Sequence, residues 1–214
     1  MKDQRAHWDA MYAETGSDRH SRPETAFGEQ VLRVIPPASR ILELGCGRGA
    51  DAARLARHGH TVLATDFSAS AIAADIAQYA NVPNLRFQTL EIAAPLPFES
   101  GAFDVVYAHL SLHYLPDRAT REVFRDINRV LRPGGLLAFL CKSTADPLYG
   151  RGKELESDMF ELDGHVRHFF SEAYARACLS GRFVIDELST GDETFYKRDS
   201  AFIHVIAHKP ASEL

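Results

Sequence analysis

Short apolar runs of strand length alternate with longer segments of helical periodicity between residues 38 and 141. Such alternation is typical of βαβ units, in which helices join parallel strands and cover both faces of the sheet. We therefore expect an α/β fold with a doubly wound, mostly parallel seven-stranded sheet. The first five strands are predicted at residues 40–44, 61–65, 85–90, 103–108 and 136–141, and the helices between them at 50–58, 69–79 and 117–131, the last closed by a turn at 132–135.

Both ends of the chain depart from this alternation. Apolar positions in residues 1–35 recur at helical spacing and predict an N-terminal helical cap, which Pro36 and Pro37 end. Residues 142–170 carry glycines and scattered charges, and we expect an irregular insertion there, over one edge of the sheet on the substrate side. We expect one domain, with a cofactor-binding core at 38–141 and a C-terminal part at 171–208 that holds a helix (171–179) and two strands (183–188 and 201–207), the last one antiparallel.

Composition is that of an ordinary globular protein, with 45% hydrophobic and 25% charged residues in 214. The formal net charge of −5 disfavours a dedicated nucleic-acid binder, because an acidic surface repels a polyanion. No apolar stretch reaches the ~20 residues that cross a bilayer, and the first residues lack the pattern of a signal peptide. The three cysteines lack the spacing of metal ligands. These features predict a cytoplasmic protein with reduced thiols, no nucleic-acid partner and no membrane partner.

Three glycines alternate directly after the first predicted strand, at Gly45, Gly47 and Gly49. Glycine permits positive φ and lets a ligand approach bare backbone, and the helix that follows points its first N–H groups toward the same place. Asp66 ends the second strand, where a carboxylate can accept hydrogen bonds from both hydroxyls of a ribose. Together these features predict a nucleoside cofactor at the carboxyl ends of the strands.

Two cofactor classes compete for this loop. A dinucleotide fingerprint has the spacing G-x-G-x-x-G, whereas this loop has G-x-G-x-G. Glu43, directly before the loop, would repel a pyrophosphate but suits a cofactor whose end carries an ammonium group. A nicotinamide-dependent oxidoreductase is therefore the weaker alternative.

Several motifs in order resemble those of class I S-adenosylmethionine-dependent methyltransferases. Residues 43–49 match that family's first motif, 66–68 its ribose-binding acid, and 131–135 the turn before its fifth strand, while 96–106 resemble the stretch that enters its fourth strand. Residues 163–170 are faintly similar to a segment of tellurite-resistance methyltransferases. The resemblance implies a Rossmann-like methyltransferase fold, S-adenosylmethionine as cofactor with S-adenosylhomocysteine as product, and methyl transfer to a small-molecule acceptor.

The resemblance also implies roles for single residues. The loop glycines would line the methionine part of the cofactor, with Glu43 near its amino group. Asp66 would hold the ribose hydroxyls. Phe67 and Ile92 would pack against the adenine, and Glu91 stands where the family often has Asp at the adenine amino group. The cofactor-binding residues expected are Glu43, Gly45, Cys46, Gly47, Gly49, Asp66, Phe67, Ser68, Glu91, Ile92 and Ala108.

Histidines cluster after the fourth predicted strand, where an acceptor should arrive. His113 or His109 could act as general base, because an unperturbed imidazole has a pKa of ~6.5; packed or solvent-facing histidines are the alternative. A soft nucleophile such as a thiolate needs no base. No cysteine or carboxylate completes a ligand set here, so we expect no metal. His165, Arg167 and His168 could form a cationic rim for an anionic substrate, or decorate the surface.

A second function class stays open from the sequence. A protein that binds S-adenosylmethionine as a sensor, without catalysis, would carry the same cofactor motifs, because every residue assigned above with a clear role serves the cofactor. A sensor would bind S-adenosylmethionine but never turn it over. The sequence predicts neither the acceptor's attacking atom nor the oligomeric state.

Overall fold

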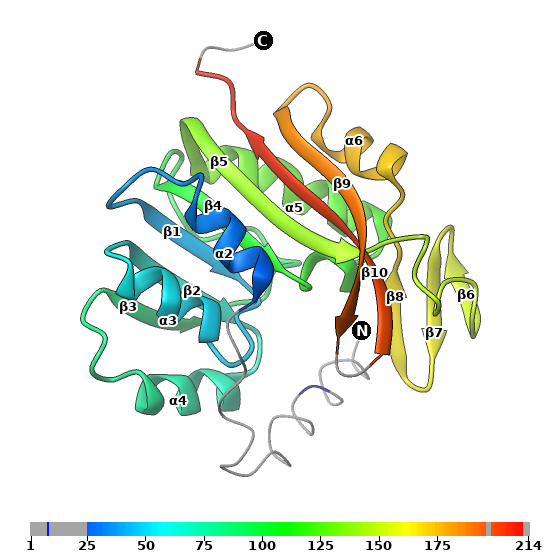
Figure 1. Cartoon of the computed structure of the whole chain (residues 1–214), viewed down its shortest axis with the longest axis horizontal. Helices are drawn as coiled ribbons and strands as arrows, with labels where there is room; N and C mark the ends of the chain where they lie inside the picture. Colours follow the sequence, from blue (N-terminus) through cyan, green and yellow to red (C-terminus); the bar gives the residue numbers. More distant parts are fainter. Residues whose placement is uncertain (1–7, 9–24, 196–197, 212–214) are drawn as a thin grey trace.

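Seven strands form the central sheet of the computed structural model, which describes residue 8, residues 25–195 and residues 198–211. The strand order is β3-β2-β1-β4-β5-β10-β9 (Figure 1). Strands β1 to β5 run parallel, and β10 is antiparallel to both β5 and β9. The predicted doubly wound, mostly parallel seven-stranded sheet is confirmed. The strands are β1 (Arg40–Leu44), β2 (Thr61–Asp66), β3 (Leu85–Thr89), β4 (Phe103–His109), β5 (Leu131–Lys142), β9 (Val184–Phe195) and β10 (Arg198–His208).

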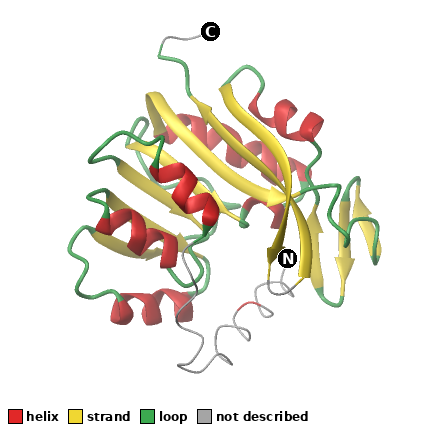
Figure 2. Ribbon diagram, in the orientation of Figure 1, coloured by secondary structure: helices red, strands yellow, loops and turns green. Residues whose placement is uncertain are grey.

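Helices cover both faces of this sheet (Figure 2). Leu42 and Leu44 of β1 join the apolar cluster under α5 (Asp117–Val130) and α6 (Glu172–Leu179). Ile41 joins the cluster under α2 (Ala26–Leu32) and α3 (Ala50–Arg57). Because both faces of β1 are buried, its apolar residues Ile41, Leu42 and Leu44 do not alternate with polar ones, and the buried Glu43 is the exception. Helix α4 (Ala69–Gln78) follows β2. Among the described residues, no helix is long and apolar enough to span a membrane.

The helices predicted at 50–58, 69–79, 117–131 and 171–179 agree with α3, α4, α5 and α6 to within one residue at each end. The difference lies in the turn after α5. The turn expected at residues 132–135 lies inside β5, which begins at Leu131, opposite Phe103 of β4. The register shifts between Phe103 and Val105, and Gly134 has a φ of 72°. The strand therefore starts five residues before the predicted position 136, and the glycine turn is an irregularity within it. Of the predicted N-terminal cap, residues 1–7 and 9–24 lie outside the described residues.

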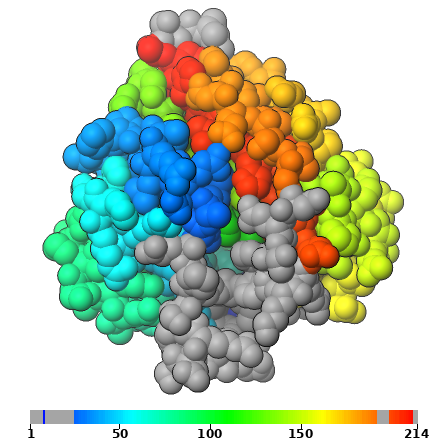
Figure 3. Space-filling view, in the orientation of Figure 1, coloured from blue at the N-terminus to red at the C-terminus, as the bar shows by residue number. Residues whose placement is uncertain are grey.

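The expectation of an irregular insertion at 142–170 is wrong. These residues contain a second, antiparallel sheet of β6 (Lys153–Glu156), β7 (Met159–Leu162) and β8 (His165–His168), which forms a lobe beside the C-terminal strands (Figure 3). Asp163 and Gly164 join β7 to β8 and both have positive φ, 54° and 76°. An Asp-Gly pair of this kind is the usual two-residue hairpin turn. That pair was the signal in the sequence that could have predicted the hairpin.

The lobe is joined to the main sheet at the carboxyl end of β5. Phe170 N–H donates to the Lys142 carbonyl (2.8 Å), and Thr144 N–H donates to the Phe170 carbonyl (3.2 Å). Strand β8 packs against the short 3-10 helix η2 (Leu112–Tyr114), and His168 Nδ1 lies 3.1 Å from the Leu115 carbonyl oxygen. These contacts place β8 beside the ends of β4 and β5.

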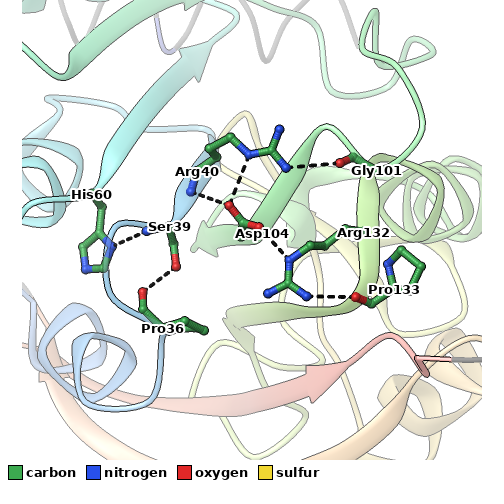
Figure 4. Close-up of polar contacts among 8 residues, drawn as sticks. All are labelled: Pro36, Ser39, Arg40, His60, Gly101, Asp104, Arg132 and Pro133. Carbon is green, nitrogen blue, oxygen red and sulfur yellow. Dashed lines mark hydrogen bonds and ion pairs between the residues drawn. The ribbon is translucent and has the colours of Figure 1, made fainter.

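A polar cluster fixes the opposite, amino ends of β1, β4 and β5 (Figure 4). Asp104 accepts hydrogen bonds from Arg40 N–H (2.8 Å) and from Arg132 Nε (2.6 Å). Burial acts to raise the pKa of Asp104, but the hydrogen bonds from Arg40 and Arg132 outweigh it and hold the pKa below its ordinary value. Ion pairs thus hold the amino ends of these three strands together.

Candidate functional site

The loop between β1 and α3 is built on three glycines with positive φ. The φ values of Gly45, Gly47 and Gly49 are 76°, 56° and 64°, in a region that residues with a Cβ rarely adopt. The N–H groups of Gly45 and Cys46 both donate to the Thr65 carbonyl, each at 2.8 Å. These two hydrogen bonds fix the loop to the end of β2. The predicted glycine loop therefore lies at the carboxyl edge of the sheet.

Close packing adds a second reason for glycine at two of these positions. A Cβ placed on Gly45 would overlap the Cβ of Ser111, and one on Gly49 would lie 2.8 Å from the Phe87 ring. Ser111 is itself held in place, because its hydroxyl donates to the Leu44 carbonyl (2.5 Å). The segment after β4 therefore approaches the glycine loop directly.

Asp66 ends β2 beside this loop and is 4% exposed. One carboxylate oxygen accepts from Gly47 N–H (3.0 Å) and the other from Ser68 N–H (3.0 Å). Each carboxylate oxygen can accept more than one hydrogen bond, so Asp66 can hold ribose hydroxyls and keep these two contacts. Ser68 also caps α4, since its hydroxyl accepts from Ala71 N–H at 3.3 Å.

Glu43 lies in β1 directly beneath the loop and is 2% exposed. Its Oε2 is buried and has no hydrogen-bond partner among the described residues. Burial raises the pKa of Glu43 well above its ordinary value, and the negative charges of Asp51 and Asp75 act in the same direction. A buried carboxyl oxygen without a partner is rare in a native structure, and a cationic N–H donor such as an ammonium group would satisfy it.

The segment directly after β3 also lies beside Asp66. Leu90 N–H donates to the Asp66 carbonyl (2.8 Å), which brings the following residues close to Asp66. Ile92 is half-buried, and its Cδ1 lies 3.7 Å from where a Cβ on Gly45 would be. Glu91 is exposed, and Phe67 is half-buried at the end of β2. These positions agree with the adenine-side roles predicted for them, which stay predictions.

Cys46 and Ala108, two further predicted cofactor residues, are both affected by burial. Burial raises the pKa of the Cys46 thiol well above its ordinary value, and the carboxylates of Glu43 and Asp66 act in the same direction. The thiol therefore stays protonated and is a poor nucleophile. Ala108 is fully buried in the apolar cluster under α5 and α6, and its contact with the cofactor stays a prediction.

The two candidate catalytic histidines differ in their surroundings. His113 in η2 is 1% exposed, and its Nδ1 is buried without a hydrogen-bond partner among the described residues. Burial lowers the pKa of His113 well below its ordinary value, and the positive charges of Arg167 and Lys142 act in the same direction. The ring is therefore neutral near pH 7 and able to accept a hydrogen bond. His109 is half-buried at the end of β4, 6.3 Å from the Phe27 ring between centroids.

A buried polar network holds α2 over this end of β4. Asp51 of α3 accepts hydrogen bonds from Thr25 N–H (3.1 Å), the Thr25 hydroxyl (2.9 Å) and the Tyr107 hydroxyl (2.9 Å). Thr25 in turn caps α2, since its hydroxyl accepts from Gly28 N–H (2.9 Å). A Cβ on Gly28 would lie 2.7 Å from Asp51 Oδ1, so glycine permits the close approach of the two helices. None of these residues was predicted to act at the site.

Comparison with known proteins agrees with this geometry. Residues 41–135 match a family model described as a methyltransferase domain. The trans-aconitate 2-methyltransferase of Deinococcus radiodurans is 34% identical over 147 residues, which are 68% of this chain and 54% of that protein. The mouse EEF1A lysine methyltransferase 4 is 32% identical over 158 residues, 66% of this chain and 61% of that protein. Residues 41–135 of the chain therefore belong to the methyltransferase domain family.

Solved structures share the fold of this methyltransferase domain at low sequence identity. An S-adenosylmethionine-dependent methyltransferase from Methanosarcina mazei has a TM-score of 0.75 at 20% identity, covering 86% of this chain and 98% of that one. The N-methyltransferase NodS from Bradyrhizobium japonicum, solved with S-adenosylhomocysteine, has a TM-score of 0.72 at 20% identity, covering 97% of this chain and 99% of that one. The chain spans about half to three fifths of the first curated relatives it matches, from 49% to 61% of their length.

Asp75 is a carboxyl of this methyltransferase domain that the sequence reasoning missed. It is fully buried on α4, and neither of its oxygens has a hydrogen-bond partner among the described residues. Burial raises the pKa of Asp75 to about 7; the positive charge of Arg48 opposes the rise, and Asp66 adds to it. With Glu43 and Asp66 it makes the site acidic, which favours a cationic ligand.

We expect Asp75→Asn to remove a pH-dependent cost of folding. The folded-state pKa of about 7 lies above the ordinary 3.8, so the wild type loses stability as pH rises through that interval. The free energy of unfolding of the variant, relative to that of the wild type, should therefore rise by roughly 1.4 kcal/mol for each pH unit between 5 and 7. Urea unfolding at pH 5 and pH 8 measures this change.

The matched control is Glu99→Gln, which changes an exposed carboxyl. Its stability should differ from that of the wild type by the same amount at both pH values. A gain for Asp75→Asn that does not grow with pH would contradict the assignment.

Proposed function

We propose that the protein binds S-adenosylmethionine at the carboxyl ends of β1, β2 and β3 and transfers its methyl group to an acceptor. The observation that carries the proposal is the buried carboxyl oxygen of Glu43 beneath the glycine loop, which has no hydrogen-bond partner among the described residues. A pyrophosphate would be repelled there, whereas an ammonium group would be bound. The residues present therefore fit this cofactor better than a dinucleotide.

Each part of the cofactor would meet a residue described above. Glu43 would accept from the amino group, directly or through water, and Asp66 would accept from the ribose hydroxyls. Phe67 and Ile92 would pack against the adenine, with Glu91 at its amino group. The cofactor supplies a methyl group on a positively charged sulfur, which is already a good electrophile. The protein's contribution is then to align acceptor, methyl carbon and sulfur and to exclude water.

The acceptor side is formed by the end of β4 and by η2. An oxygen or nitrogen acceptor loses a proton as it is methylated, and His113 would take that proton at its buried Nδ1, which no described residue hydrogen-bonds. His109 is the second candidate base. A thiolate acceptor would need neither histidine.

We further propose that the acceptor is a small molecule and that the protein acts in the cytoplasm. The names of the relatives cover both a small acid and a protein lysine as acceptors, so the choice between them depends on this chain's own residues. Acceptor specificity in such folds depends on segments attached to the core, here α2 and the lobe of β6–β8. The net charge of −5 supports a small acceptor over a nucleic acid.

A turnover assay tests the proposed activity. The protein is incubated with methyl-labelled S-adenosylmethionine and separate panels of small thiols, carboxylic acids, phenols and amines, and S-adenosylhomocysteine is quantified. We expect acceptor-dependent formation of S-adenosylhomocysteine with at least one panel. Binding of S-adenosylmethionine without turnover in any panel would favour a sensor and contradict the enzymatic proposal.

A further inference from the structure

Arg167 is a charged side chain that the proposed mechanism does not use. It lies in the middle of β8 and is half-buried. It forms no hydrogen bond, ion pair or ring contact with any residue that the structure describes. Withdrawing a guanidinium from water without a partner is unfavourable, and this group pairs best with a carboxylate or phosphate.

The position of β8 brings this charge to the acceptor side. Strand β8 packs on η2, which carries His113, and Phe170, three residues after Arg167, is hydrogen-bonded to the end of β5 at Lys142 (2.8 Å). The positive charge of Arg167 is close enough to act on both neighbours. Burial lowers the pKa of Lys142, and the charge of Arg167 also acts to lower it, as it does for His113.

Lys142 is already neutralised, whereas Arg167 is not. The Lys142 ammonium donates to Asp146 (2.6 Å) and to the Ser200 hydroxyl (2.8 Å), and it lies 4.6 Å from the centre of the Phe202 ring. Asp146 is occupied as well, since it also accepts from Ala201 N–H (3.1 Å). Of these two cations, Arg167 is therefore the one without an ionic partner among the described residues.

We propose that Arg167 binds a carboxylate of the methyl acceptor. The inference rests on the proposed methyltransferase function and names the substrate class for it. A planar guanidinium can donate two parallel hydrogen bonds to a carboxylate, which would hold the acceptor by its acidic end. The reacting atom would then lie toward His113, whose buried Nδ1 has no hydrogen-bond partner in the part of the chain that the structure describes. A cationic acceptor such as an alkylammonium would be repelled by the same arginine.

Binding to the product complex tests this assignment without turnover. Protein saturated with S-adenosylhomocysteine is titrated by calorimetry with two matched pairs, 3,4-dihydroxybenzoate against its amide and 3-mercaptopropionate against its amide. We expect the wild type to bind each carboxylate roughly tenfold to hundredfold more tightly than the amide, because the carboxylate gains charge-assisted hydrogen bonds. Arg167→Gln should remove the preference, and Arg167→Lys should retain part of it.

The control variant is Arg151→Gln, which changes an exposed arginine of the same insertion and should leave the preference as in wild type. All variants should bind S-adenosylhomocysteine equally, and this first titration reports on the proposed function alone. Equal affinity for carboxylate and amide in the wild type would overturn the inference, as would a preference that persists in Arg167→Gln. No binding of either carboxylate to a protein that binds S-adenosylhomocysteine would also overturn it, with the cofactor proposal intact. If S-adenosylhomocysteine itself does not bind, both proposals fail.

Discussion

Gly45→Ala is expected to destroy cofactor binding and to destabilise the fold. Gly45 has a φ of 76°, which costs a residue with a Cβ about 1–2 kcal/mol. The new Cβ would also overlap the Cβ of Ser111, whose hydroxyl is bonded to the Leu44 carbonyl. Relief requires either the loop or the segment after β4 to move, and overpacking of this kind costs about 1–3 kcal/mol more. Because the moved groups line the proposed cofactor site, affinity for S-adenosylhomocysteine should fall by roughly hundredfold or more.

Gly59→Ala is the matched control for this substitution. Gly59 also has a positive φ, 90°, but a Cβ there would meet nothing within 4 Å. In urea unfolding, Gly59→Ala should lose only the stability that a positive φ costs a residue with a Cβ. It should bind S-adenosylhomocysteine as the wild type does. If the two variants have the same stability loss and the same affinity, the close approach of Gly45 to Ser111 has no role in the site.

Asp66→Ala is expected to weaken the binding of S-adenosylhomocysteine roughly tenfold to hundredfold. The substitution removes a charge-assisted contact to the ribose, worth ~1.5–3 kcal/mol. It also removes the acceptor for the N–H groups of Gly47 and Ser68, each at 3.0 Å, so the loop loses a fixed point. Calorimetric titration measures the affinity, and urea unfolding shows whether the variant is folded.

Asp66→Asn separates the charge of this residue from its shape. Asparagine keeps one side-chain oxygen that can accept a hydrogen bond but carries no charge. Its affinity for S-adenosylhomocysteine should lie between those of the wild type and Asp66→Ala. Unchanged affinity in a folded Asp66→Ala protein would disprove the assignment of Asp66 to the ribose.

The positions of the glycine loop and of Asp66 could be predicted because their determinants are local in the sequence. Gly45, Gly47 and Gly49 follow one strand directly, and Asp66 ends the next strand, so strand order alone brings them together. The structure places all four at the carboxyl edge of the sheet. The same argument predicted the seven-stranded sheet from alternating strands and helices.

The remaining parts of the site depend on contacts between distant residues. Asp51 meets Thr25 and Tyr107 across 26 and 56 positions, and no spacing rule relates them. Asp75 lies in an alanine-rich helix whose pattern does not show which face is buried. The lobe of β6–β8 was missed because each of its strands has four residues, too few for an alternating pattern to be recognised.

The central claim is that the acidic glycine-loop site binds S-adenosylmethionine rather than a dinucleotide. The most direct test is calorimetric titration of the purified protein with S-adenosylmethionine, S-adenosylhomocysteine and NAD under the same conditions. The account predicts saturable binding of the first two and none of NAD, because an ammonium group would stabilise the ionised form of the buried Glu43 carboxyl, whereas a pyrophosphate would not. Binding of NAD with no binding of S-adenosylhomocysteine would contradict it.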